Sequence, residues 1–297
     1  MTTTDVSSDV LAALSPLSVS WFKAGYCIHP EAVVTPGTSW KTIQFPAMFA
    51  FIQHPTAGNL LFDTGYSDRF FQATARFPNR LYAMITPVFL QPHESAVEQL
   101  ASKGITADSI RYIFVSHFHA DHIGGLKDFP QAMFICERAG YEAVSQKQGI
   151  GALMAGFLPE LLPPDFEKRA LFVDEMPKVS AFPNLFETGF DVLGDRSLIA
   201  IELPGHAKGQ LGLLFRSQTG QSYFLVADAC WSSQAYQELV APSAIAQVIF
   251  SDRAAYKSTL EKLHQLHLQY PDIQIIPTHC GELWRRLSAP QLSESNN

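Results

Sequence analysis

The chain has 297 residues, of which 47% are hydrophobic and 16% are charged, so it carries ample apolar material for a packed core. Lysine and arginine together number 21, against 28 aspartate and glutamate residues, which gives a net charge of -7. Proteins that hold nucleic-acid phosphates usually carry the opposite balance. The composition therefore argues against both a disordered chain and a nucleic-acid partner.

Four cysteines are scattered along the chain without a CxxC pair, which indicates reduced thiols and not a disulfide framework. The N-terminus lacks a basic leader, and no apolar run is long enough to span a bilayer. We therefore expect a cytoplasmic protein with no membrane partner. The sequence leaves a homodimer open.

The N-terminal third has the pattern of β-hairpins. "AMFAFIQHP" (47–55) and "NLLFDTG" (59–65) predict strands joined by turn residues. Residues 92–104 then predict a helix that stops at Gly104. The apolar run "IRYIFV" (110–115) follows directly and predicts a buried strand.

The second half alternates strands with a helix. Strands are predicted at 197–203, 222–227 and 272–276, with a helix at 254–270 between the last two. This alternation is typical of a layered α/β architecture. No Pro/Gly/Ser-rich linker divides the chain, so we expect a single domain over residues 1–297 with a frayed tail from about residue 288.

Residues 137–170 depart from this pattern, because they are apolar, rich in glycine and proline, and fit no strand. Two interpretations remain open for the segment. It can form a pair of helices packed on the surface, or it can form a cap over a functional site.

The stretch "SHFHADHIGG" (116–125) places four potential metal ligands, three histidines and one aspartate, directly behind a predicted strand. Side chains two apart in an extended segment point the same way, so His117 and His119 can bind one ion. Asp121 and His122 follow after a turn and can face a second ion. Imidazole and carboxylate are ligands that suit Zn²⁺ and similar divalent metals. A surface histidine cluster without metal is the less favoured interpretation.

Three further candidate ligands follow other predicted strands directly or within three residues: His206 in "LPGHAKGQ", Asp228 in "FLVADAC" and His279 in "IIPTHCGE". Strand ends are where α/β folds gather functional groups. Taken alone, His206 or His279 would more often be an ordinary turn histidine. Together with the earlier cluster, they predict one shared metal site.

The order HxHxDH, His, Asp, His resembles the metallo-β-lactamase superfamily over most of the chain. The resemblance implies an α/β fold, an αββα four-layer sandwich with the metals at one edge between the sheets. It also implies two divalent metal ions per chain, with Zn²⁺ as the first expectation and Fe, Mn or Co as alternatives. It assigns His117, His119 and His206 to one metal, Asp121, His122 and His279 to the other, Asp228 as a bridge, and Asp63 of "LLFDTG" to a supporting position beside the metals.

This ligand set suggests hydrolysis of a small molecule. Our hypothesis is that a metal-bridging hydroxide attacks the carbonyl carbon of a lactone or ester, with Asp121 as the catalytic residue that accepts a hydrogen bond and moves the proton. Three aromatic residues, Phe118, Phe157 and Trp231, are predicted to contact the substrate in an apolar pocket.

Within the superfamily, the chain resembles the N-acyl-homoserine lactonase group most, in its ligands, its "FDTG" motif and its approximate length. That group usually has a tyrosine three residues after the bridging aspartate, where this chain has Trp231. Two alternatives remain. One is a glyoxalase II-like thioester hydrolase, for which only "LWRR" (Arg285, Arg286) hints at a basic substrate region. The other is a persulfide dioxygenase-like oxidoreductase with a single iron.

Overall fold

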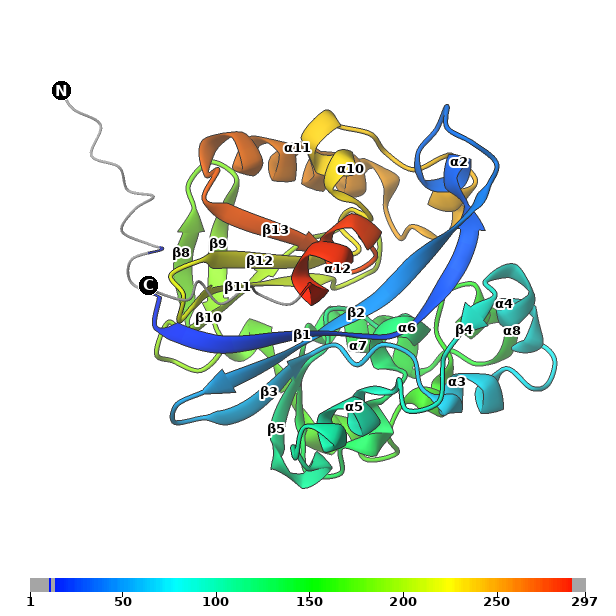
Figure 1. The fold of residues 1–297 in the computed structure, drawn as a ribbon, viewed down its shortest axis with the longest axis horizontal. Coiled ribbons are helices and arrows are strands. Elements are labelled where there is room, and N and C mark those ends of the chain that lie inside the picture. Colours follow the sequence, from blue (N-terminus) through cyan, green and yellow to red (C-terminus); the bar gives the residue numbers. More distant parts are fainter. Residues whose placement is uncertain (1–10, 12–13, 290–297) are drawn as a thin grey trace, which may run out of the picture.

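A computed structural model describes residue 11 and residues 14–289 of the chain. Two β-sheets stack face to face, and helices cover the outer face of each sheet (Figure 1). This arrangement confirms the predicted αββα sandwich. The predicted frayed tail begins at the end of the last helix, and its residues from 290 onward lie outside the described residues.

The first sheet contains most of the N-terminal half of the chain. Its long strands β1 and β2 are antiparallel, β3 joins β2, and β5, β6 and β7 then follow in parallel. The short strand β4 pairs with the far end of β1. The bounds of these strands are β1 (Pro16–Pro30), β2 (Thr42–His54), β3 (Gly58–Phe62), β4 (Val88–Phe89), β5 (Ile110–Phe114), β6 (Met133–Cys136) and β7 (Ala170–Phe172).

The second sheet contains the C-terminal half. β8 to β12 pair as successive antiparallel neighbours, and β13 adds to β12 in parallel. The two sheets meet where the start of β1 pairs with the end of β11. The bounds are β8 (Lys178–Phe182), β9 (Phe186–Asp191), β10 (Leu198–Glu202), β11 (Leu211–Ser217), β12 (Ser222–Ala227) and β13 (Ile273–Pro277).

Strand β2 shows why the sandwich has three apolar layers. Its side chains alternate between the two faces of the sheet, as expected for a strand. Met48 and Ile52 pack between the sheets, whereas Phe49 and Phe51 pack against the helices below. A third core lies under the helices of the second sheet and includes Leu260. Both faces of the strand are therefore buried, which explains its nearly continuous apolar sequence.

The helices lie outside the sheets or at their edges. α10 and α11 cover the second sheet, α5 covers the first, and α12 packs against β1 and β2 (Figure 1). The bounds are α2 (Glu31–Val34), α3 (Asp68–Ala73), α4 (Arg80–Ile85), α5 (Ala96–Ser102), α6 (Ala120–Ile123), α7 (Arg138–Ser145), α8 (Gly149–Leu153), α9 (Phe166–Arg169), α10 (Ser233–Glu238), α11 (Arg253–Gln269) and α12 (Gly281–Ser288). Among the described residues, no helix has the length and apolarity needed to cross a membrane.

Most predicted elements agree with the structure to within one or two residues, but two strands and one helix have different bounds. The strand predicted at 47–55 begins five residues earlier, at Thr42, and the strand predicted at 59–65 ends three residues earlier, at Phe62. The helix predicted at 92–104 begins later, at Ala96, because residues 92–95 form a turn in which the backbone N–H of Glu94 donates to the carbonyl of Gln91. Residues 137–170 are mainly helical, containing α7, α8 and α9 with a 3₁₀ turn at Pro159–Leu161. Helical structure is compatible with both interpretations of the segment, surface packing and a cap over a site, and both stay predictions.

Candidate metal centre

Strand ends of both sheets deliver the seven candidate ligands to one edge of the sandwich. β5 leads into the HxHxDH stretch, in which Asp121 and His122 occupy the first turn of α6. From the other sheet, Asp228 follows β12 directly, and His279 follows β13 after one residue. The strand before Asp228 contains a register shift, and Ala227 has a φ of 46°. Such a backbone conformation is uncommon outside glycine and often occurs beside functional groups.

The loop after β3 holds the loop after β5 in place. The hydroxyl of Thr64 donates to the carbonyl of His122 at 2.9 Å, and the hydroxyl of Ser67 donates to the carbonyl of Gly124 at 2.6 Å. A Cβ on Gly124 would lie 2.5 Å from the carbonyl oxygen of Gly65. Only glycine permits this approach, which accounts for the glycines that follow the histidines.

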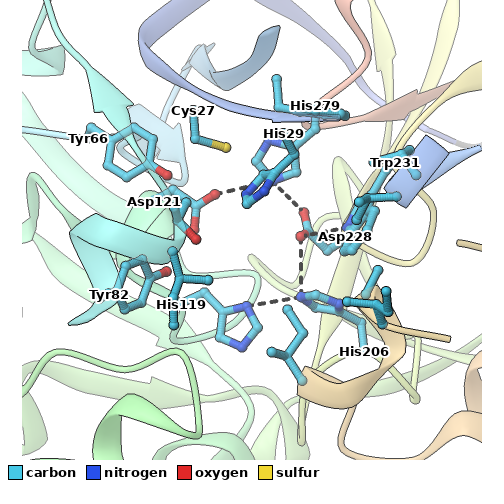
Figure 2. A pocket seen from close by; sticks show the side chains of 18 residues that line it. Cys27, His29, Tyr66, Tyr82, His119, Asp121, His206, Asp228, Trp231 and His279 are labelled. Atoms are coloured by element: carbon cyan, nitrogen blue, oxygen red, sulfur yellow. Dashed lines mark hydrogen bonds and ion pairs between the residues drawn. The ribbon is translucent and has the colours of Figure 1, made fainter. Parts of the chain in front are cut away.

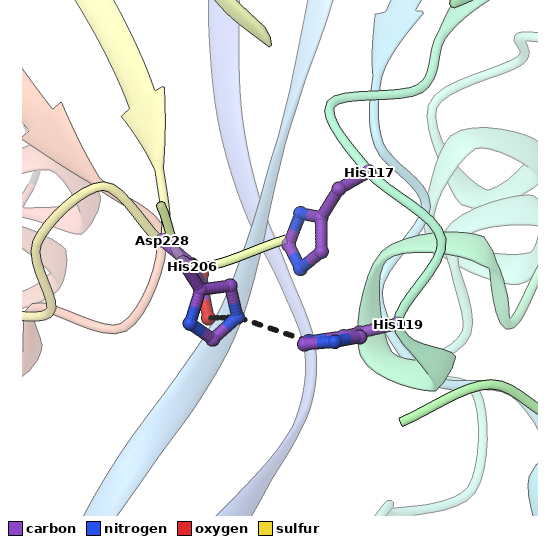
Figure 3. Close-up of side chains that lie close together, drawn as sticks. All are labelled: His117, His119, His206 and Asp228. Atoms are coloured by element: carbon purple, nitrogen blue, oxygen red, sulfur yellow. Dashed lines mark hydrogen bonds and ion pairs between the residues drawn. The ribbon is translucent and has the colours of Figure 1, made fainter. Parts of the chain in front are cut away.

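The first group of ligands consists of His117, His119, His206 and Asp228 (Figure 3). One ligand atom from each lies within 4.8 Å of the others. Nε2 of His206 is 3.0 Å from Nδ1 of His119 and 3.2 Å from Oδ2 of Asp228. Three imidazoles and one carboxylate oxygen therefore converge on one point, which suits a tetrahedral divalent metal.

The second group consists of Asp121, His122 and His279, whose ligand atoms also lie within 4.8 Å of one another. Nε2 of His279 is 3.2 Å from Oδ2 of Asp121. The other oxygen of Asp228, Oδ1, is 3.1 Å from Nε2 of His279 and 3.3 Å from Nε2 of His122. Asp228 thus presents one oxygen to each group, as a bridging ligand requires.

The histidines of the first group are neutral. Burial is the largest effect on each, and it lowers the pKa of His119 to about 4 and the pKa of His206 to about 3. Burial also holds the pKa of His117 well below its ordinary value. Neutral imidazole is the form that coordinates metal, so no proton needs to leave these three residues when an ion binds.

The histidines of the second group have the opposite tendency. Burial alone would lower their pKa values, but the nearby carboxylates outweigh it. Asp63, Asp121 and Asp228 raise the pKa of His122 to about 10, and Asp228 and Asp121 raise that of His279 well above its ordinary value. A strongly negative environment of this kind is one that a divalent cation would neutralise.

Buried atoms without partners show that the residues fit metal ions. Nε2 of His117, Nε2 of His122 and Oδ1 of Asp228 are buried and have no hydrogen-bond partner of good geometry among the described residues. Leaving such atoms unpaired costs free energy, and buried polar groups in folded proteins are nearly always satisfied. Ions at the two groups would satisfy all three atoms.

Asp63 supports the second group through His122. Its Oδ2 is 2.7 Å from Nδ1 of His122, and its two oxygens also accept hydrogen bonds from the backbone N–H and hydroxyl of Ser116, both at 2.8 Å. A carboxylate behind a ligating histidine fixes the orientation of the ring and increases its basicity. The structure therefore places Asp63 in the supporting position implied by the family resemblance.

A pocket of about 260 Å³ opens above the ligands, and Figure 2 shows the side chains around it. Asp121, His119, His206, Asp228 and His279 reach its base. Its walls are mainly apolar, and isoleucines surround its mouth although they are exposed to solvent. The apolar lining residues are Val33, Val34, Phe45, Ile85, Trp231, Ile245, Ala246 and Ile249.

Two of the three predicted substrate contacts lie outside this pocket. Phe157 is 1% exposed and packs in the core beneath the first sheet. Phe118 points away from the pocket because side chains alternate along the extended ligand segment, and it packs on Phe166. Trp231 does line the pocket, and its indole N–H donates to Oδ2 of Asp228 at 3.0 Å. The apolar walls come from α2, β2, α4, Trp231 and residues 245–249, and not from Phe157.

Four residues of the N-terminal third also reach the pocket although the sequence analysis did not single them out. Cys27 and His29 lie near the end of β1, Tyr66 follows the "DTG" motif, and Tyr82 lies on α4 (Figure 2). Burial raises the pKa of Cys27 to about 12 and lowers that of His29, so both are neutral near pH 7. Of these four, Tyr66 lies closest to a motif used in the sequence analysis, three residues after Asp63 of "LLFDTG".

Comparison with known proteins agrees with this geometry. The profile of the metallo-beta-lactamase superfamily matches residues 45–219, more than half of the chain. The chain therefore belongs to the metallo-beta-lactamase superfamily, as the ligand motif indicated. Its two groups of ligands match a dinuclear metal site of that superfamily.

Among curated proteins, the chain is 26% identical over 244 residues to the N-acyl homoserine lactonase AttM of Agrobacterium fabrum, covering 81% of this chain and 84% of that protein. It is 24% identical over 226 residues to an N-acyl homoserine lactonase of Bacillus thuringiensis, covering 73% and 77%. A solved N-acyl homoserine lactone hydrolase with the product N-hexanoyl-L-homoserine at its catalytic metal center has a TM-score of 0.71 at 19% identity, covering 92% of this chain and 97% of that chain. The dizinc quorum-quenching lactonase AidC has a TM-score of 0.62 at 16% identity, covering 90% and 89%.

Proposed function

We propose that this protein is a dinuclear metal-dependent hydrolase that opens a lactone or cleaves an ester with an apolar acyl part. The observation that carries the proposal is the placement of two ligand groups, bridged by Asp228, at the base of an apolar pocket. The relatives named as lactonases support the same chemistry. A single-iron oxidoreductase, the main alternative, would leave the second ligand group without a role.

Two divalent ions, when bound, supply an activated water and polarise a carbonyl group. The protein contributes the fixed positions of the ligands. Asp121 belongs to the second group and also faces the pocket, so its carboxylate can accept a proton from the attacking water. We propose Zn²⁺ as the metal because imidazole and carboxylate ligands suit it, as they also suit Fe, Mn and Co.

The pocket walls favour a small, apolar substrate. Val34, Phe45 and Ile249 present hydrocarbon close to the ligands, and the polar groups gather at the base. An acyl group bound between these walls would exclude water from the reacting carbonyl. Arg285 lies on α12 and lines a neighbouring cavity of about 630 Å³, which shares Trp231 and His279 with this pocket. The thioester alternative therefore has one basic side chain near the pocket and is compared directly in the test below.

The test is a hydrolysis panel with protein whose metal content has been quantified. Lactones, aryl esters, thioesters, β-lactams and phosphoesters are compared at equal concentrations, with Asp228→Ala prepared in parallel as the control. We expect the highest kcat/KM for lactones or aryl esters with apolar acyl groups, and two metals per chain. A preference for β-lactams or phosphoesters would contradict the proposal, as would one iron per chain together with oxidation of a persulfide.

A further inference from the structure

A substrate oxygen that the metals do not contact would be stabilised by a hydrogen-bond donor of the protein, and the indole of Trp231 is already engaged in another hydrogen bond. The indole N–H of Trp231 donates to Oδ2 of Asp228 at 3.0 Å. Trp231 therefore orients the bridging carboxylate. A donor for the substrate has to come from another side chain that lines the pocket.

Two tyrosines face Trp231 across the pocket, and their hydroxyl groups point inward on the side of Asp121 (Figure 2). Tyr66 is 1% exposed, packs edge-on against Phe70 and lies beside the thiol of Cys27. Its hydroxyl is hydrogen-bonded with the thiol of Cys27. Tyr66 is therefore a part of the pocket wall.

Tyr82 stands closer to the pocket opening. It lies on α4, where Met84 and Ile85 are exposed at the surface, and its ring packs edge-on against Phe70 with 5.6 Å between centroids. Its hydroxyl points into the pocket between Asp121 and His119 (Figure 2). A tyrosine hydroxyl carries its proton near neutral pH, so Tyr82 can donate a hydrogen bond.

We propose that Tyr82 is a substrate-binding residue whose hydroxyl donates a hydrogen bond to the single-bonded oxygen of the substrate's ester group. This inference rests on the proposed ester or lactone hydrolysis. In that reaction the carbonyl oxygen is the atom polarised by the metals, whereas the single-bonded oxygen gains negative charge as the C–O bond breaks. A hydrogen-bond donor on the pocket wall opposite Asp228 would stabilise the negative charge that develops on this oxygen, from the side of the substrate that faces away from Asp228.

His29 is the other candidate donor, because its imidazole lines the same pocket beside His279. Its ring faces Phe45 with 6.1 Å between centroids, on the wall formed by β1 and β2. It therefore lies over the second ligand group and away from the gap between Asp121 and His119 that Tyr82 faces. Tyr82 faces the gap between the two ligand groups, so it is the better placed donor for a substrate that spans both groups.

The variant Tyr82→Phe tests the proposal, since it removes the hydroxyl and keeps the ring that packs on Phe70. Removing a donor to developing charge typically lowers kcat by about 10²–10³-fold, so we expect a loss of that order for an alkyl lactone. For a 4-nitrophenyl ester we expect kcat to fall by less than about tenfold, because the nitrophenolate leaving group delocalises its negative charge and needs no hydrogen-bond donor. Tyr66→Phe is the matched control, with losses similar for both substrates.

Two further measurements do not depend on turnover. Elemental analysis should find the same metal content in Tyr82→Phe as in the wild-type protein. Calorimetry should find that the ring-opened hydroxy acid binds Tyr82→Phe about tenfold more weakly, which corresponds to the loss of one hydrogen bond. His29→Phe should retain the selectivity of the wild-type protein for alkyl leaving groups.

Several results would overturn the inference. Equal losses of Tyr82→Phe on the alkyl lactone and the nitrophenyl ester would show that its hydroxyl does not act on the leaving oxygen. If Tyr66→Phe or His29→Phe, and not Tyr82→Phe, lost activity selectively on the alkyl lactone, the residue replaced in that variant would be the donor. If the wild-type protein holds both metals and hydrolyses neither substrate, the proposed function itself fails and the inference fails with it.

Discussion

The two ligand groups of the metal centre differ in how the protein holds them. In the first group, the ring of His119 lies against the backbone of residue 156, where a Cβ would be only 2.5 Å from the imidazole. Nδ1 of His206 is buried without a partner among the described residues. In the second group, Nδ1 of His122 bonds to Asp63 and Nδ1 of His279 donates to the carbonyl of Pro46, at 2.7 and 2.8 Å.

The difference shows that one centre combines two ways of orienting a ligand. The first group relies mainly on close packing of neutral rings, with one hydrogen bond of 3.1 Å between the Ser116 hydroxyl and Nδ1 of His117. The second group relies on hydrogen bonds and negative charge. Variants that disturb packing should therefore weaken one site, and variants that remove a supporting carboxylate should weaken the other. Asp228, a member of the first group, presents its second carboxylate oxygen to the second group.

The largest effect is expected for Asp228→Ala, which removes the shared ligand. Each group would lose a carboxylate oxygen, so at least one metal should be lost per chain and kcat/KM should fall by more than about 10³-fold, comparable to removing a central catalytic group. Elemental analysis and kinetics on the same preparation measure both effects. A variant that keeps both metals would disprove the bridging role.

Asp63→Asn should weaken the second site selectively. Loss of a carboxylate behind a ligating histidine typically costs about 10–100-fold in metal affinity, and asparagine keeps an acceptor for Ser116. Competition with a chelator should show one weakened ion and one unchanged ion. Asp195→Asn is the matched control, because Asp195 bonds to buried His54 at the same distance of 2.7 Å far from the metal ligands. Equal weakening of both ions would contradict the comparison.

Gly156→Ala should weaken the first site. Gly156 has a φ of +64°, a conformation that costs an ordinary residue about 1–2 kcal/mol, and the added methyl would displace the ring of His119. We expect one ion to bind about tenfold more weakly, because a displaced imidazole is comparable to one that has lost its supporting hydrogen-bond partner. We also expect a lower midpoint of unfolding. Gly151→Ala is the control, because a Cβ there meets nothing within 4 Å. An unchanged first site would mean that packing does not orient His119.

The smallest effect is expected for Trp231→Phe. This change removes one hydrogen bond to Asp228, worth about 0.5–1.5 kcal/mol, so kcat should fall by less than about tenfold and both metals should remain. Trp21→Phe, whose ring packs on Tyr223 away from the pocket, is the control. A hundredfold fall in kcat with both metals bound would show that Trp231 acts directly on the reacting atoms.

The ligand groups could be predicted because each ligand follows an apolar strand and belongs to a compact polar motif. Strand periodicity placed β2, β3 and β5, and the spacing from His117 to His122 then predicted two neighbouring ions. The αββα architecture followed from the family resemblance. These features are encoded locally, within a few residues of one another.

The pocket walls could not be predicted in the same way. Tyr82 and Ile249 lie on short surface helical turns whose positions depend on long-range packing, and nothing in their local sequence marks a pocket. Phe157 looked like a substrate contact because its segment is apolar, yet its own side chain packs into the core, whereas Ile150 and Met154 of the same segment are exposed. Composition alone does not separate a buried aromatic residue from one that lines a pocket.

Strand β1 limits where residues can be inserted into this chain or deleted from it. Its start joins the two sheets through β11, and its end brings Cys27 and His29 to the pocket. Deleting one residue between these points would turn every later side chain of the strand to the opposite face of the sheet, or it would break the pairing with β11. Insertions and deletions should therefore be excluded from β1 and tolerated in the exposed loop at 36–41, so a library of length variants should recover folded proteins from the loop and few from the strand.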